Sequence, residues 1–343
     1  MRTKSFVART AFALTAALAV CLISAGVTLT LAQGGRSSQP TLSSEEQSML
    51  KAIMSATDPA AKFKAVDVLI KKHPKTPVRE RIAREAANQI GDLKNATQKV
   101  TLAQQYAALF TEPSEQQMIM PILIEALAGA GKFDEAFASG SDFLTRNPDA
   151  LFVLVELVSV GTNQAKQKNP KFIPQSLQYG AHAIDLIEAD KKPADMDDAG
   201  WKKYKGDMLP SLYQSTGVIN LVKGDHDGAK ARLAKAAELA PTDPFNYLLL
   251  AGILNDEYQA GAAHYKTTPA GPAKDEELKR LLASLDQVID AYAHTVALAE
   301  GNERYQAVRQ QYLGDLESYY KYRHNNSTAG MQQLIDKYKL PAK

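Results

Sequence analysis

The stretch GDHDGAKARLAKAAELAPTDPFNYLLLAGIL, residues 224–254, decides how the rest of the chain is interpreted. Gly224 permits a tight turn, and the residues after it have the spacing of a helix that ends before Pro241, which cannot continue it. Ala229 and Ala236 lie seven residues apart on one face of this helix, with the bulk of Leu233 between them. Small side chains let a neighbouring helix approach closely. The stretch therefore predicts a helix that packs tightly on the helix before it.

An earlier stretch repeats this spacing. Gly131 precedes Ala136 by five residues and Pro148 by 17, the same intervals that separate the glycine, alanine and proline of the later stretch. Upstream of the later glycine, Tyr213 and Gly217 place an aromatic and a small residue four apart on the preceding helix. In these residues the chain resembles the tetratricopeptide repeat (TPR) family, whose unit of about 34 residues is a pair of antiparallel helices.

The resemblance is closest over residues 117–150 and 210–243, and it weakens elsewhere. In the first of these repeats Gly140 and Phe143 stand where the second has Leu233 and Ala236, so the large and small positions are exchanged, and Ile124 replaces the small residue at Gly217. Along the chain, helical stretches recur and each is followed by a proline, at positions 74, 113, 148, 193 and 241. We therefore predict an all-α fold, a right-handed superhelical solenoid of irregular, TPR-like antiparallel helix pairs.

The N-terminal segment predicts export. Arg2, Lys4 and Arg9 precede an uncharged run that is long enough to span a bilayer, so residues 1–32 are expected to be a cleaved signal peptide, with Gln33 as the new N-terminus. The alternative is a membrane anchor formed by residues 11–32. Residues 33–42 are small and polar and read as a flexible linker, and the repeat domain is expected over 43–343, starting with a helix at Ser43. Both interpretations indicate a periplasmic or secreted protein of the bacterial envelope.

The amino-acid composition and the failed motifs exclude several classes of catalytic and metal sites. Cys21 is the only cysteine and lies in the leader, which excludes a thiolate zinc site or a cysteine nucleophile from the repeat domain. The six histidines are too far apart in sequence for a His-x-x-x-His metal pair, and the basic and acidic residues nearly balance, so nothing draws the protein to nucleic acid. Phosphate-loop, calcium-loop and hydrolase motifs fail at essential positions, as in GAGK (129–132) and DMDDAG (195–200). The sequence predicts no enzyme, no cofactor and no metal.

Two segments interrupt the series of helical stretches. The C-terminal helices, in addition, are rich in tyrosine. Residues 162–174 lengthen a turn, and residues 260–277 read as a Gly/Pro-rich excursion, either of which is a tolerated insertion or a place where the scaffold acquires function. Within the helices expected over 275–340, Tyr305, Tyr312 and Tyr319 are spaced by seven residues. This stripe is either a core seam between the last helices or an exposed aromatic groove for a peptide or glycan.

The leading hypothesis is a non-catalytic scaffold for protein–protein interaction, with a glycan or soluble-substrate module as the alternative and an unrecognised enzyme site as a third. In a repeat stack the first helix of each unit lines the inner curve, where the partner is expected to bind. The candidate partner-binding residues on this concave face are Gln214, Val218, Leu221, Leu248, Asn255 and Asp256. Some TPR proteins clamp a peptide's C-terminal carboxylate with basic and asparagine side chains, but the corresponding positions here carry Pro121, Glu125, Gln214, Val218, Leu248 and Gly252. The resemblance thus implies a partner with an apolar or mixed surface.

Overall fold

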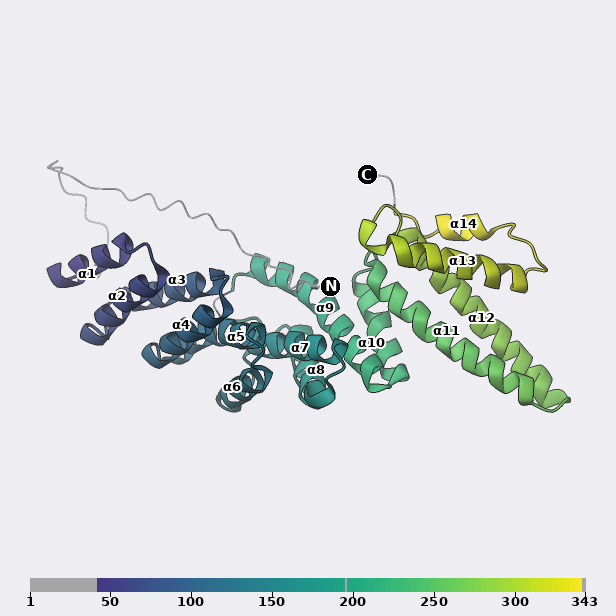
Figure 1. Cartoon of the computed structure of the whole chain (residues 1–343), viewed down its shortest axis with the longest axis horizontal. Coiled ribbons are helices and arrows are strands. Elements are labelled where there is room, and N and C mark those ends of the chain that lie inside the picture. Colours follow the sequence, from purple (N-terminus) through teal and green to yellow (C-terminus); the bar gives the residue numbers. More distant parts are fainter. Residues whose placement is uncertain (1–41, 195, 341–343) are drawn as a thin grey trace, which may run out of the picture. The chain divides into compact units, whose positions relative to one another are not determined.

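A computed structural model describes residues 42–194 and 196–340, and over these residues the chain is helical with no strand (Figure 1). The chain divides into two compact units, and the boundary between them falls within a helix, between Met118 and Ile119. Each unit is built from antiparallel helix pairs, as the prolines in the sequence predict. Of the five prolines that were expected to close helical stretches, three lie two residues beyond a helix end and Pro113 begins α5, while Pro193 lies in the connection between α8 and α9.

The first unit contains α1 (Ser44–Ser55), α2 (Pro59–Lys72), α3 (Arg79–Asp92), α4 (Ala96–Leu109) and the start of α5 (Pro113–Gly129). The predicted start at Ser43 is confirmed, because Ser43 and Glu46 form a capping box that satisfies backbone N–H groups at the head of α1. Apolar side chains at helical spacing form the core between α2, α3 and α4, and Leu69, Ala83 and Tyr106 are among its fully buried members.

A buried ion pair joins α3 to the start of α5 within the first unit. The Arg79 guanidinium donates two hydrogen bonds to Glu115, of 2.6 Å from Nε and 2.9 Å from Nη2, and lies 5.3 Å from the ring centre of Phe110. Glu115 is only 3% exposed. The hydrogen bonds to Glu115 raise the pKa of Arg79, and the pair ties the start of α5 to α3.

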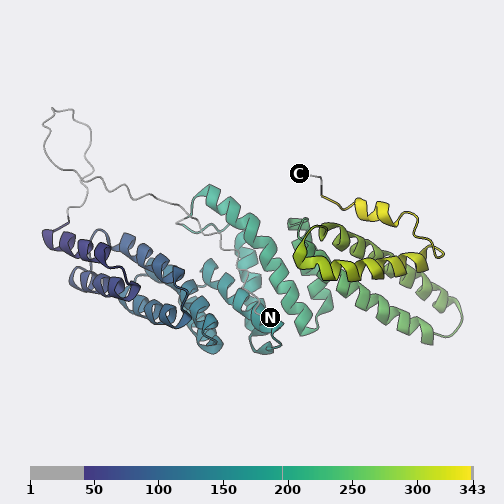
Figure 2. The same cartoon turned by 45° about the horizontal axis from the view of Figure 1, so that its top comes forward.

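The second unit completes α5 and continues through the rest of the chain. Its remaining helices are α6 (Phe133–Arg146), α7 (Leu151–Lys166), η1 (Pro170–Phe172), α8 (Ile173–Glu188), α9 (Asp198–Lys223), α10 (His226–Leu239), α11 (Pro244–Thr267), α12 (Pro272–Leu298), η2 (Glu303–Tyr305), α13 (Gln306–Arg323) and α14 (Met331–Asp336). Successive helices pack as hairpins, and α7, α9 and α11 are the first helices of three successive pairs (Figures 1 and 2).

The seam between α9 and α10 contains the glycine, alanines and leucine of the stretch 224–254. Gly224 ends α9 with φ of 83°, a conformation that favours glycine, and Ala229, Leu233 and Ala236 are each 0% exposed. A Cβ atom on Gly217 of α9 would lie 2.8 Å from Leu233 Cγ, so the two helices touch here without a side chain between them. The predicted close packing is confirmed.

The exchange of large and small residues in the earlier repeat is compensated across its own seam. Gly140 of α6 faces Ile124 of α5, and a Cβ on Gly140 would lie 3.1 Å from Ile124 Cδ1 and 2.8 Å from Leu157 Cδ1 of α7. The small residue has moved from the first helix to the second, and the large residue has moved the other way. In each hairpin a large residue on one helix packs against a glycine on the other, and the two hairpins differ in which helix carries the glycine.

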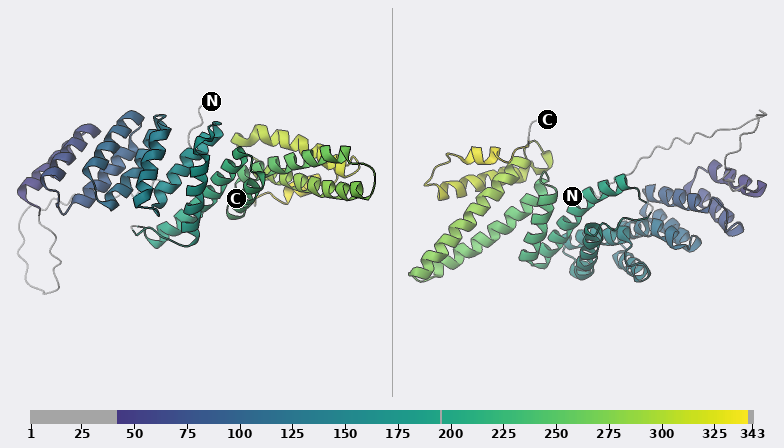
Figure 3. Two further views of the ribbon diagram at one scale, coloured as in Figure 1. Left: turned by 90° about the horizontal axis from the view of Figure 1, so that it is seen from below. Right: turned by 180° about the vertical axis from the view of Figure 1, so that it is seen from behind.

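The structure corrects two expectations about the interruptions. Most of residues 260–277 are helical, because α11 continues to Thr267 and α12 starts at Pro272, so the excursion is a long hairpin with a short turn. The two helices run side by side in every view (Figures 1 and 3). Residues 162–174 likewise extend α7 and form η1 rather than an open loop. In addition, α9 begins at Asp198 and contains Pro210 in its interior, whereas the repeat was expected to start at Pro210.

The fold class is thus confirmed as an all-α solenoid of TPR-like antiparallel helix pairs, and the right hand of the superhelix stays a prediction. Within the described ranges, no helix has the length and apolar character needed to cross a membrane. The signal peptide or anchor (1–32) and most of the linker (33–42) lie outside the described residues.

Candidate protein-binding surface

The candidate residues of α9 lie in three different environments. Gln214 is half-buried, and its Nε2 donates to Asp243 Oδ2 at 2.8 Å and to Asn246 Oδ1 at 2.9 Å. Leu221 is half-buried against the seam formed by Ala229, Leu233 and Ile253. Val218 is 6% exposed, so the expectation that its side chain is exposed is wrong. Val218 was expected on the concave face of the first helices, but neighbouring helices of the second unit cover it.

The candidate residues of α11 are partly covered by α13. The Tyr312 hydroxyl donates to the Leu248 carbonyl oxygen at 3.3 Å, and the Tyr319 hydroxyl donates to Asn255 Oδ1 at 2.7 Å. Asp256 is exposed. The face of α11 expected to receive a partner and the tyrosine stripe expected as its alternative thus contact each other. Leu248 and Asn255 stay predicted partner contacts, with their access limited by α13.

The tyrosine stripe is a core seam. Tyr312 and Tyr319 pack on the cluster that includes buried Tyr258 and Tyr292, with Tyr292 and Tyr312 ring centres 4.5 Å apart. Burial raises the pKa of Tyr292, Tyr312 and Tyr319 because the charged phenolate would lose its hydration. The interpretation as an exposed aromatic groove is not supported at these two residues. Tyr305 is half-buried in η2, outside this cluster.

A histidine holds the C-terminal end of the chain. The His294 ring of α12 lies between Tyr247 and Tyr338, with ring centres 3.6 Å and 4.0 Å away. Burial lowers the pKa of His294, and the nearby Asp290, which accepts a hydrogen bond from the Tyr338 hydroxyl, opposes this effect without overcoming it. The stack therefore contains neutral imidazole at neutral pH and ties the segment after α14 to α11 and α12.

Helices α7, α9 and α11 of the second unit bring charged and polar side chains together near the start of α11. Asp243 caps this helix by accepting from the Phe245 N–H at 3.0 Å, and its other oxygen accepts from Gln214. Asn246 is 1% exposed and its Nδ2 has no partner among the described residues. Lys166, the last residue of α7, reaches the Phe245 ring of this helix, and Arg304 lies in η2 beside Tyr305.

Each of these two cations lies beside an aromatic ring. Lys166 Nζ is 5.8 Å from the ring centre of Phe245, and Arg304 Cζ is 5.6 Å from the ring centre of Tyr305. Both distances are within the range of cation–π attraction. Neither residue was predicted as part of a site from the sequence. Lys166 falls in the segment 162–174 that was singled out.

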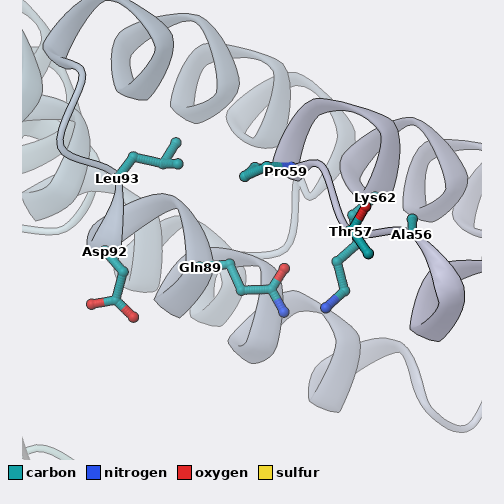
Figure 4. Close-up of a pocket in the computed structure, with 7 residues that line it drawn as sticks. All are labelled: Ala56, Thr57, Pro59, Lys62, Gln89, Asp92 and Leu93. Atoms are coloured by element: carbon teal, nitrogen blue, oxygen red, sulfur yellow. The ribbon is translucent and has the colours of Figure 1, made fainter.

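The first unit has two shallow grooves. One, of about 330 Å³, is lined by residues of the α1–α2 turn, the start of α2, the end of α3 and the residue after it. In Figure 4 the Lys62 and Gln89 side chains reach towards one another while Asp92 points away. The other, of about 630 Å³, lies between the ends of α2 and α4 and includes Lys71, Lys75 and Arg79. No group of three or more His, Cys, Asp or Glu residues in the described parts of the chain could hold a metal ion.

The fold and these surfaces define a helical-repeat protein with TPR-like hairpins. One solved structure to which the chain is similar is a tetratricopeptide repeat protein from Parabacteroides merdae, with a TM-score of 0.40 and 10% sequence identity over 86% of this chain and 98% of that one. No protein-family profile and no curated protein sequence matches the chain.

Proposed function

We propose that the protein is a non-catalytic scaffold that binds a protein partner on the first helices of its second unit. The observation that carries the proposal is which faces of α9 are buried in the hairpin seams and which remain exposed. The alanines and leucine of α10 are wholly buried, with Leu233 against Gly217 of α9, and Ile219 on the other side of α9 packs on Ala165 and Ile173. A strip of α9 that includes Ser211, Gln214 and Ser215 stays exposed or half-buried. There Ser215, two residues from Gly217, is half-buried and makes no side-chain hydrogen bond within the described residues. Accessible first-helix faces suit peptides and helices.

Site-specific photo-crosslinking in cells tests this proposal. A photoreactive residue at Ser215 reports on the first-helix face of α9, and the same residue at Ala231 of α10, which is exposed and two residues from buried Ala229 and Leu233, is the matched control. We expect a discrete adduct with one partner from position 215 and none from position 231. Equal adducts at both positions, or none from 215, would contradict a partner on this face.

We further propose that this scaffold works in the bacterial envelope. The support is the basic N-terminus followed by the apolar run, which is the pattern of an export signal. Cell fractionation with intact-mass measurement tests it: cleavage gives a chain starting at Gln33 in the periplasm or medium, and an anchor gives the whole chain in the inner membrane. Recovery of the whole chain from the cytosol would overturn export.

A further inference from the structure

The larger groove of the first unit is lined mainly by cations and apolar side chains. It has a volume of about 630 Å³ and lies between the ends of α2 and α4, next to the turn that leads into α5. This volume is within the roughly 300–1,000 Å³ that is usual for ligand sites. The charged part of its lining consists of three cations, Lys71, Lys75 and Arg79, and one carboxylate, that of Glu112.

Two of the three cations form ion pairs, and in both pairs the cation is the more exposed partner. Lys71 Nζ lies 2.9 Å from Asp67 Oδ1, and the lysine side chain is 69% exposed against 31% for the aspartate. The Arg79 side chain is 19% exposed against 4% for that of Glu115. Neither Asp67 nor Glu115 lines the groove. Both pairs therefore present their positive end to it.

Among the described residues, Lys75 and Arg79 keep hydrogen-bond donors that have no acceptor. Lys75 is exposed and forms no ion pair or side-chain hydrogen bond within this part of the chain. Arg79 is held by Glu115 and by the Pro74 carbonyl oxygen, which accepts from Nη1 at 3.2 Å. Its Nη1 and Nη2 atoms each carry a second N–H that these bonds leave unused. A fixed guanidinium with spare donors, in one groove with an unpaired ammonium, suits carboxylates.

The rest of the lining favours a peptide over a polyanion. Pro74 and Ala108 are exposed and Leu109 is half-buried, so an apolar side chain can lose hydration against them. Glu112 adds a negative charge to the same lining. A nucleic-acid strand carries a charge at every nucleotide and would be repelled by Glu112, whereas a peptide can place its carboxylates only where the cations are.

We propose that this groove binds an acidic segment of a protein partner that carries an apolar side chain between its carboxylates. The carboxylates pair with Lys75, with the exposed end of Lys71 and with the unused N–H groups of Arg79. The apolar side chain lies against Ala108 and Leu109. This site belongs to the first unit and does not depend on the surface proposed on α9, so each can be tested without the other.

The probe is the fluorescein-labelled, amidated peptide Glu-Glu-Leu-Glu-Glu, and its binding to the full chain is measured by fluorescence anisotropy at low salt. We expect Lys71→Gln combined with Lys75→Gln to weaken binding by about fivefold or more, because two exposed ion pairs with the peptide are lost. Lys64→Gln combined with Lys94→Gln removes the same charge from exposed positions outside the groove. This control pair should weaken binding by less than about twofold.

Ala108→Trp tests the groove itself. Because Ala108 is exposed, the indole is accommodated at the surface and fills the groove, and binding should fall by about fivefold or more. Thr101→Trp, at another exposed position of α4 outside the groove, is the matched control and should leave binding within about twofold. Arg79 is left unchanged, since its loss would leave the Glu115 carboxylate buried without its partner. Circular dichroism verifies that all variants keep the helical content of the parent.

Four results would overturn the inference. The first is a parent protein that does not bind the probe. The second is an equal loss in the two lysine pairs, or no loss in either, since both results would exclude a role for Lys71 and Lys75 in this groove. The third is equal binding by Ala108→Trp and Thr101→Trp. The fourth is displacement of the probe by inorganic phosphate or a single-stranded oligonucleotide at lower concentration than by unlabelled peptide, which would assign the cations to phosphate groups.

Discussion

Replacing Gly217 by alanine probes the seam between α9 and α10. The added Cβ would lie 2.8 Å from Leu233 Cγ, 3.1 Å from Leu233 Cδ2 and 3.4 Å from Arg232 Cβ. The nearest atom is the branch carbon of a side chain that is 0% exposed, so it cannot swing away into solvent. The matched control is Gly206→Ala in the same helix, where no atom lies within 4 Å of the new Cβ.

Both substitutions change the helix propensity in the same way, but only the one at Gly217 creates a steric clash. Alanine is a better helix former than glycine by about 1 kcal/mol, which should raise the free energy of unfolding at both positions. Overpacking at Gly217 should lower it by about 1–3 kcal/mol, so this variant is destabilised on balance or gains nothing. Because the helix-propensity term cancels, the difference between the variants isolates the clash at about 1–3 kcal/mol.

Urea unfolding followed by the fluorescence of Trp201 measures this difference. Trp201 is the only tryptophan, it is 6% exposed, and it lies in α9 itself, so its emission reports on the helix that carries both glycines. In a Leu233→Ala background the clash is removed, and Gly217→Ala should then stabilise the protein as Gly206→Ala does. If both glycine substitutions stabilise the parent protein equally, the reasoning about this seam is refuted.

Three further predictions concern other positions. Burial holds the pKa of His294 below its usual 6.5, so the unfolded state binds a proton more readily, and stability should fall as pH drops from about 6.5 towards the folded pKa. Thermal unfolding of His294→Gln should lack this part of the pH dependence, and an unchanged profile would exclude the effect. Glu115→Gln leaves Arg79 charged in a largely buried position and should cost about 3–5 kcal/mol in chemical unfolding, whereas a loss below about 1 kcal/mol would show that water reaches the guanidinium. Gly224→Ala places a side chain at φ of 83° and should lower stability by about 1–2 kcal/mol; a rise in the melting temperature would mean that the turn relaxes.

Local chemistry explains what the sequence predicts correctly. A glycine in the left-handed region, a proline beyond a helix end and the Ser43 cap each act through the backbone of a few neighbouring residues. Such signals are complete within one short stretch. The helix pairs, their order and the small residues of the best-matched seam could therefore be predicted from the sequence.

The exchange at Ile124 and Gly140 shows where sequence reasoning becomes misleading. From the sequence it is a departure from the repeat, because each position is judged by its own size. In the structure the two residues face each other, and their combined volume fills the seam. The candidate surface was harder still to predict, because Lys166 reaches the Phe245 ring only after α7 and α11 have packed. Val218, which was predicted to face a partner, was misjudged for the same reason, since helical periodicity does not reveal which neighbour covers a face.

The long hairpin of α11 and α12 has a practical consequence for handling the protein. Its turn, residues 268–271, is mostly exposed, and the 24- and 27-residue helices on either side are held together along their length by side chains. A foreign sequence such as a fluorescent protein or an affinity tag can therefore be placed between Pro269 and Ala270 without disturbing the ends that pack on the rest of the unit. At about 1.5 Å per residue, the insertion would sit roughly 35–40 Å along the helices from their far ends. The hairpin thus provides an internal labelling point for following the protein in living cells without altering its N-terminal segment.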